Sequence, residues 1–386
     1  MKKLGTIIFL AFTLMSGSAP IAQAQHKAYS RAVVDTLCSP YFYGRGYLKN
    51  GMDKAAKYIA GKFASSGLTP LSGQSYFQHF SYPANTFPGV VKVSIVGREL
   101  VTGRDFLVAP ESRANKGSFT LEQRDSNTYL GAGKVPVVVE LVKKLTWSPA
   151  PEVADYTLIQ LLDTTGNSTP KKVQLHIEQE FIPQFNAANV CAMVKGTRHP
   201  DSFLVVTAHY DHLGGLGNKV YFPGANDNAS GVALLLSLAQ YYARNPQPYS
   251  MVFIAFAGEE IGLKGSRYFT EHPLIPLSRI RFLINTDLAG TGVDGITVVN
   301  ATEFPKAFAD LQQINAENKL FPAVHSRGKA ANSDHYFFTE KGVPAFFIYT
   351  QGGIAAYHDI YDRAATLPLD HQEQLFQLIV QFFKGM

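Results

Sequence analysis

Two short apolar runs, with one apolar helical segment between them, constrain the fold of this chain most strongly. Residues 203–208 read FLVVTA and residues 251–257 read MVFIAFA, and both runs contain many β-branched or aromatic residues. Such runs are typical of parallel strands that are buried on both faces. A turn-forming cluster at residues 224–231 precedes the apolar segment 232–243, which predicts a helix between the two strands.

Strands and helices continue to alternate after this unit. Further strands are expected at residues 280–286, 296–299 and 343–350, and further helices at residues 305–318 and 370–383. The pattern predicts an α/β fold, a three-layer sandwich with a mixed, largely parallel sheet.

One region of the chain departs from this alternation. Strand-like runs at residues 90–96, 136–142 and 157–162 are separated by clusters of Gly, Asn, Ser and Pro, and the region shows no strong helical periodicity. We expect a small β-rich insertion at about residues 83–170. The main domain, residues 25–386, is expected to resume with strands near residues 173–180 and 189–194.

The beginning of the chain has the pattern of an export signal. Lys2 and Lys3 precede an apolar run at residues 4–15, and Ala22-Gln23-Ala24 resembles a cleavage site. The run is shorter than the ~20 residues that span a bilayer. We therefore expect a signal peptide at residues 1–24, export to a periplasm or beyond, and no stable membrane anchor.

Charge and cysteine content exclude some classes of function. Without Lys2 and Lys3, the formal net charge of +5 falls to +3, which is too weak to indicate a nucleic-acid partner. The two cysteines are Cys38 and Cys191. An oxidising compartment would permit a bridge, but the apolar run around Cys191 favours a buried, unpaired thiol. The sequence does not predict an oligomeric state.

Polar side chains follow the predicted central strands. His209 comes directly after the first run, Asp227 lies in the turn cluster, and Glu260 follows the second run. Each of these residues alone has an ordinary structural interpretation. Together they bring one imidazole and two carboxylates to the carboxyl ends of adjacent strands, where open α/β sheets bind ligands. This donor set suits Zn²⁺, and Mn²⁺ or Co²⁺ in the same geometry.

Five segments, in order, resemble the motifs of a known family. They are AHYDH at 208–212, GANDNASG at 224–231, AGEEIGLKGS at 257–266, NTD at 285–287 and YHD at 357–359. They are similar to the motifs of the co-catalytic di-zinc aminopeptidases, typified by aminopeptidase Y and related to glutamate carboxypeptidase II and the glutaminyl cyclases. The resemblance implies a zinc exopeptidase fold and two Zn²⁺ ions.

The resemblance also implies roles for the metal ligands. Asp227 matches the carboxylate that bridges the two ions. His209 and Asp287 would complete one site, and Glu260 and His358 the other.

Further roles follow from the same resemblance. Glu259 matches the general base, Asp211 matches an acid that orients the first histidine, and Tyr357 matches a hydrogen-bond donor to the oxyanion. A cis peptide bond between Asp227 and Asn228 is implied as well.

Residues outside these five motifs have a less defined role. Ser333-Asp334-His335 resembles a supporting motif that several relatives precede with a substrate-contacting arginine; here the residue is Asn332, and Arg327 or Lys329 could substitute for it. We expect a packing role for Arg45, in a loop rich in Gly and aromatic residues.

The expected function is removal of N-terminal residues from peptides with a free N-terminus. Apolar first residues are expected to be preferred, because the following residues lie on or beside the segment that carries the last histidine: Phe346, Phe347, Ile348, Ile354 and Tyr357. Of these, Phe346 and Ile348 are better explained as strand core. The alternatives are a single-zinc acyltransferase like the glutaminyl cyclases, a di-zinc carboxypeptidase or dipeptidase, and a silent binding protein.

Overall fold

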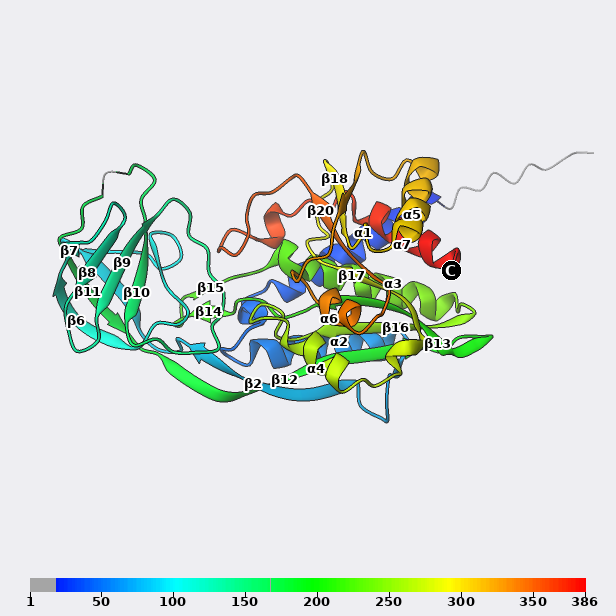
Figure 1. Cartoon of the computed structure of the whole chain (residues 1–386), viewed down its shortest axis with the longest axis horizontal. Coiled ribbons are helices and arrows are strands. Elements are labelled where there is room, and N and C mark those ends of the chain that lie inside the picture. Colours follow the sequence, from blue (N-terminus) through cyan, green and yellow to red (C-terminus); the bar gives the residue numbers. More distant parts are fainter. Residues whose placement is uncertain (1–18, 167) are drawn as a thin grey trace, which may run out of the picture.

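A nine-stranded mixed sheet forms the centre of the larger part of the molecule (Figure 1). Its order is β1 (Thr69–Pro70), β12 (Glu180–Val194), β16 (Tyr249–Phe256), β13 (His199–His209), β17 (Ile280–Thr286), β20 (Ala345–Gln351), β18 (Gly295–Val299) and β19 (Val324–Arg327), with β2 (Phe77–Thr86) also paired to β12. The four central strands, β16, β13, β17 and β20, are parallel, and the antiparallel pairs lie towards the edges. The computed structural model describes residues 19–166 and 168–386.

Helices cover both faces of this sheet. They are α1 (Ala19–Leu37), α2 (Gly51–Ser65), α3 (Gly231–Arg244), α4 (Lys264–Glu271), α5 (Pro305–Asn318), α6 (His335–Glu340) and α7 (Gln372–Lys384). Side chains of β13 alternate between the two faces, as the pleat of a strand requires. Leu204 and Val206 pack in the core beneath α1, α2, α3 and α7, whereas Val205 packs in a second core with Phe269 of α4 and Phe338 of α6. The expected three-layer α/β fold is confirmed.

Residues 1–18 of the expected signal peptide, residues 1–24, lie outside the described residues. Only its end, from residue 19, belongs to α1. Within the described residues, no helix is both long and apolar enough to cross a membrane. Cys38 and Cys191 are free and buried.

A β-rich region forms the second part of the molecule, on the left in Figure 1. One of its sheets contains β5 (Phe106–Val108), β10 (Thr157–Leu162), β9 (Val137–Val142), β8 (Thr128–Gly131) and β7 (Glu122–Gln123). The other contains β4 (Arg98–Glu99), β3 (Val91–Ile95), β11 (Lys172–Ile177) and β6 (Asn115–Thr120). Both contribute to one core, in which Val93, Val139 and Leu175 are buried.

The expected boundaries of the insertion need correction. The sequence predicts that the insertion ends near residue 170 and that residues 173–180 belong to the main sheet. However, β11 pairs with β3 and β6 in the smaller sheet. Residues 83–86, which were assigned to the insertion, are the end of β2 in the main sheet. An alternating strand of this kind is apolar on one face in either sheet, so its periodicity does not identify its partners.

Two long strands connect the parts. β2 and β12 pair along almost their whole length, from Phe77 opposite Val190 to Thr86 opposite Glu180. The hairpin of β14 (Gly215–Leu216) and β15 (Val220–Tyr221) lies between the parts in Figure 1. Leu216 and Phe222, from this hairpin and its exit, are buried in the core of the β-rich region.

Candidate metal centre

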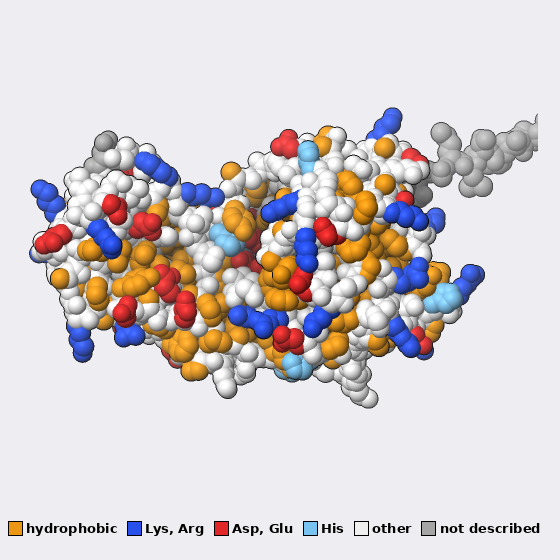
Figure 2. Space-filling view, in the orientation of Figure 1, with side chains coloured by type: hydrophobic (Ala, Val, Ile, Leu, Met, Phe, Trp, Pro, Cys, Tyr) orange, Lys and Arg blue, Asp and Glu red, His pale blue; other side chains and the backbone are white. Residues whose placement is uncertain are grey.

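Acidic and histidine side chains meet at the carboxyl ends of the central parallel strands. His209 is the last residue of β13, Asp287 directly follows β17, and His358 lies in the loop after β20. Glu259 and Glu260 lie in the turn after β16. In the space-filling view, histidine and acidic side chains are visible in the hollow between the two parts of the molecule (Figure 2).

Asp227 comes from the turn before α3. This turn, η2 (Ala225–Ser230), contains the cis peptide bond between Asp227 and Asn228, as expected, and the backbone angles of these two residues are not helical. Gly224 enters the turn with a φ of 60°, and a Cβ added to it would lie 2.2 Å from the backbone oxygen of Asp227. Only glycine fits this position without moving the backbone.

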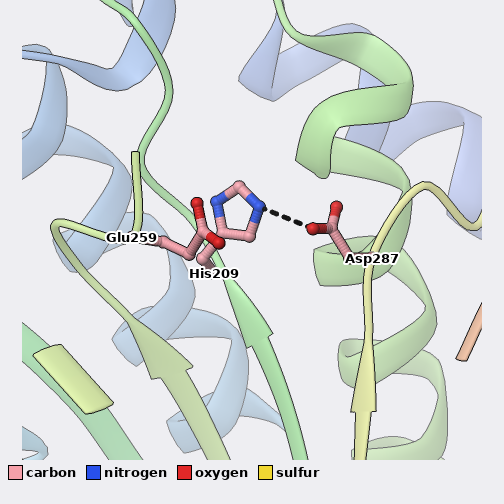
Figure 3. A group of neighbouring side chains, drawn as sticks. All are labelled: His209, Glu259 and Asp287. Carbon is pink, nitrogen blue, oxygen red and sulfur yellow. Dashed lines mark ion pairs between the residues drawn. The ribbon is translucent and has the colours of Figure 1, made fainter. Parts of the chain in front are cut away.

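Three of the side chains form a first group around His209. Its Nε2 lies 3.3 Å from Oδ1 of Asp227 and 3.3 Å from Oδ2 of Asp287. Figure 3 shows the ring of His209 between Glu259 and Asp287, with the contact to Asp287 dashed. Ligand atoms of His209, Glu259 and Asp287 all lie within 4.8 Å of one another.

A second group surrounds His358. Its Nε2 lies 3.2 Å from Oδ2 of Asp227 and 3.1 Å from Oε2 of Glu260. The two carboxylate oxygens of Asp227 therefore face different imidazoles, and a second carboxylate accompanies each imidazole.

The donor atoms fit divalent cations. Nε2 of His209 is buried and faces two carboxylate oxygens at 3.3 Å, and Oδ1 of Asp287 is buried without a hydrogen-bond partner among the described residues. Buried polar atoms normally have partners, and buried carboxylates need positive charge nearby. Imidazole nitrogen and carboxylate oxygen are ligands that Zn²⁺ accepts.

The pKa shifts reflect the crowding of these charges. Burial would raise the pKa of the Asp227 carboxyl, but hydrogen bonding to His209 and His358 holds it well below its usual range. Burial raises the pKa of Glu259 well above its usual range, and the neighbouring Glu260 adds to the shift. The same crowding thus shifts the pKa values of two neighbouring carboxyl groups in opposite directions.

Asp211 supports the site in a way that only partly matches its expected role. Its backbone oxygen lies 3.2 Å from Nδ1 of His209, whereas its carboxylate oxygen Oδ1 is 3.9 Å away. The carboxylate instead accepts hydrogen bonds from the backbone N–H groups of Glu259 at 3.2 Å and Glu260 at 3.3 Å. Burial raises the pKa of Asp211 to about 7.

Tyr357 lies at the open side of the site. Its side chain is 46% exposed, and its ring stacks on that of His358 with centroids 4.0 Å apart. Burial of its hydroxyl and the nearby Asp227 raise its pKa.

Three further residues support the site; His212 belongs to the AHYDH motif, whereas no motif contains Asp362 or Ser148. Asp362 accepts hydrogen bonds from the backbone N–H groups of Asn226 and Asp227. Nδ1 of His212 lies 2.6 Å from Oε1 of Glu260. Ser148, from the β-rich region, lies against His358.

In the Ser333 motif, Ser333 has a hydrogen-bond partner, whereas the buried polar side-chain atoms of Asp334 and His335 have none among the described residues. Ser333 accepts a hydrogen bond from Asn285, and Asn332 is exposed. Both residues that could replace the missing arginine already have partners. Arg327 contacts the hydroxyl of Tyr349, and Lys329 pairs with Glu340.

Comparison with known proteins identifies relatives over most of the larger part. The family model described as "Peptidase family M28" matches residues 189–383. "Aminopeptidase YwaD" of Bacillus subtilis is 32% identical over 237 residues, which are 59% of this chain and 50% of that protein. A "probable zinc metalloprotease" of Pyricularia oryzae is 38% identical over 106 residues, 27% of this chain and 21% of that protein. The chain thus aligns with at most half of either relative.

Solved structures share the fold. "BSAP, a zinc aminopeptidase from Bacillus subtilis" superposes with a TM-score of 0.70 at 19% identity, over 93% of this chain and 94% of that one. A Porphyromonas gingivalis glutaminyl cyclase gives a TM-score of 0.54 at 12% identity, over 93% and 98% of the two chains. At these identities the likeness establishes the architecture.

Proposed function

Because the chain belongs to peptidase family M28, we propose that it is a two-metal aminopeptidase that removes single residues from the free N-terminus of peptides. The observation that carries the proposal is the position of Asp227. Its two oxygens lie 3.3 and 3.2 Å from Nε2 of His209 and Nε2 of His358. A carboxylate in this position can bind two ions at once.

The ligands divide into two sets in this proposal. His209, Asp227 and Asp287 would hold one Zn²⁺, and Asp227, Glu260 and His358 the other. Two bound ions polarise a carbonyl group and lower the pKa of a bound water molecule.

Glu259 is the general base in this proposal. Its carboxylate takes a proton from the attacking water and passes it to the leaving amine. Two features support this role. Its backbone N–H is fixed by Asp211, and its half-buried side chain lies beside His209 and Asp287.

Tyr357 borders the route by which a peptide would reach the site. The side chains of His358 and Asp287 are 14% and 11% exposed, whereas that of His209 is 1% exposed. The substrate therefore approaches from the side of Tyr357, whose hydroxyl would donate a hydrogen bond to the oxyanion.

We also propose a preference for apolar first residues. Fewer of the apolar side chains expected from the sequence support it, because several of them are buried. Phe346 and Ile348 are fully buried in the core, and Phe347 is 3% exposed. Tyr357 remains beside the site, where its ring stacks on His358, whereas Ile354, earlier in the same loop, packs against the main core. The pattern of residues 1–24 supports export of the enzyme to a periplasm or the exterior.

The test combines metal analysis with substrate competition. The enzyme should hold two ions per chain and cleave leucyl p-nitroanilide, while N-acetyl-leucyl p-nitroanilide should stay intact. Cleavage of both amides at equal rates would refute the requirement for a free amine. A single bound ion, together with cyclisation of an N-terminal glutamine, would favour the acyltransferase alternative.

A further inference from the structure

A loop of the β-rich region reaches the candidate metal ligand His358. This loop, residues 143–156, connects β9 to β10. Oγ of Ser148 lies 3.1 Å from Nδ1 of His358, and the backbone N–H of Trp147 donates a hydrogen bond to the carbonyl oxygen of His358 at 3.0 Å. The side chain and the backbone of His358 are thus both contacted by consecutive residues of the same loop.

Two residues of this loop, Trp147 and Lys144, fix its position through contacts with neighbouring segments. The indole N–H of Trp147 donates to the carbonyl oxygen of Val108 at 2.8 Å, and its ring stacks on Phe222 with centroids 5.5 Å apart. Because Trp147 is 3% exposed, these contacts are shielded from water. Lys144 adds a hydrogen bond to the carbonyl oxygen of Ala355, in the loop that carries His358.

His358 needs such support more than the other imidazole does. Its φ of 53° lies in the left-handed region, which a residue with a Cβ seldom adopts unless its surroundings hold it there. His209, by contrast, is the last residue of a central strand. Its Nδ1 lies 3.2 Å from the backbone oxygen of Asp211, two residues further along the chain.

In a metal-bound histidine, the hydrogen bond of the ring nitrogen that does not bind the metal controls the orientation of the nitrogen that does. A hydrogen bond from Nδ1–H fixes both the tautomer and the orientation of the ring, so that Nε2 faces the metal. In His358, Nε2 faces Asp227 and Glu260. Within the described residues, the hydrogen bond found for Nδ1 of His358 is the one with the Ser148 hydroxyl.

We propose that Ser148 is a positioning residue, which orients the His358 imidazole and so lets the β-rich region complete the second metal site. The inference rests on the proposed two-metal function. It gives the β-rich region a direct part in metal binding, with Ser148 acting through His358 and touching neither the substrate nor the metal.

The test is a metal titration of the full-length, metal-free protein. Wild type should bind two equivalents of Zn²⁺ by calorimetry, and two equivalents of Co²⁺ should each give a distinct visible absorption change. In Ser148→Ala, affinity for one equivalent should fall by ~10–100-fold, the loss typical of a missing outer hydrogen bond to a ligand. The Co²⁺ spectrum should change for that equivalent and stay the same for the other.

Two further variants separate orientation from packing. Ser148→Thr keeps the hydroxyl and should restore the affinity and the spectrum. Ser118→Ala removes an exposed hydroxyl from β6 of the same region and should behave as wild type. Thermal unfolding of each metal-free variant shows whether it folds.

The outcomes are distinguishable. Wild type with two ions and Ser148→Ala with unchanged affinities would overturn the inference and leave the proposed function standing. Loss of affinity that Ser148→Thr fails to restore, or that accompanies unfolding of the metal-free protein, would also overturn it. Wild type with a single ion would overturn the proposed function, and the inference with it.

Discussion

The buried guanidinium of Arg45 donates a hydrogen bond to the backbone oxygen of Asp227 at 3.2 Å, across 182 positions of sequence. The other hydrogen bonds of this guanidinium also go to backbone oxygens, those of Leu37, Tyr210, Pro223 and Gly224. One side chain therefore ties the end of α1 to both the strand end after His209 and the turn that carries Asp227.

The first prediction is that Arg45→Met destabilises the protein by at least about 3 kcal/mol, because hydrogen bonds to a charged group contribute ~1.5–3 kcal/mol each and several carbonyl oxygens lose their donor. Metal affinity should fall as well, since the turn around Asp227 loses a support. Urea unfolding and zinc titration measure the two effects. Arg124→Met, at an exposed position, is the control and should change neither quantity.

The second prediction concerns the central carboxylate. Asp227→Ala should remove both metal ions, because Asp227 faces both imidazoles, and a chelator should inactivate the wild type in the same way. Metal content after dialysis measures the first effect, and activity restored by added Zn²⁺ measures the second. Asp310→Ala, on the exposed face of α5, should keep both ions. One tightly retained ion in Asp227→Ala would contradict the bridging role.

The third prediction separates catalysis from metal binding. Glu259→Gln should retain both ions and lower kcat by ~10²–10⁴-fold, the usual contribution of a general base. The amide has nearly the same shape as the carboxyl but cannot accept the proton. Glu317→Gln, on exposed α5, should retain full activity. A near-native rate in Glu259→Gln would show that another group takes the proton.

The fourth prediction is a pH dependence of stability that arises from His335. Burial lowers the pKa of this imidazole from 6.5 to about 4. As the pH falls from about 6.5 to about 4, the unfolded chain binds a proton that the native state does not. The contribution of His335 to stability is therefore complete above pH 6.5 and is lost through this window, at a rate on the order of 1 kcal/mol per pH unit.

Urea unfolding of the metal-free protein between pH 4 and 7 measures this effect. His335→Asn should show a shallower loss of stability than wild type on acidification. His325→Asn, at an exposed position of β19, should follow the wild-type curve. Parallel curves for wild type and His335→Asn would refute the assignment.

The elements of the α/β part could be predicted because their signals are local. The expected strand at residues 280–286 and helix at residues 305–318 coincide with β17 and α5. Buried runs of apolar residues and their stop signals lie within a few positions of each other. The cis bond after Asp227 followed from the family motif and is confirmed.

Contacts between distant segments could not be predicted in this way. Ser148 and Asp362 are ordinary loop residues, and their contacts with His358 and Asp227 span 210 and 135 positions. The alternation of apolar and polar residues in β11 predicts a strand but does not specify that this strand pairs with β3 and β6. The sequence provides only a weak indication of the contacts of Arg45, because a charged residue stands there among glycine and aromatic neighbours.

The pairing of β2 with β12 has a consequence for how this architecture could be rebuilt. Thr86 and Glu180, where the chain leaves and re-enters the main sheet, are direct partners. In topological terms, everything between them is the loop of a hairpin, so a short turn could replace it without changing the register of the main sheet. Such a deletion, or a graft of a foreign module at the same two points, would keep the sheet but remove the hydroxyl that faces His358. Exchange of the module therefore keeps the register of the main sheet, but the new module must cover Leu216 and Phe222 and restore the contact with His358.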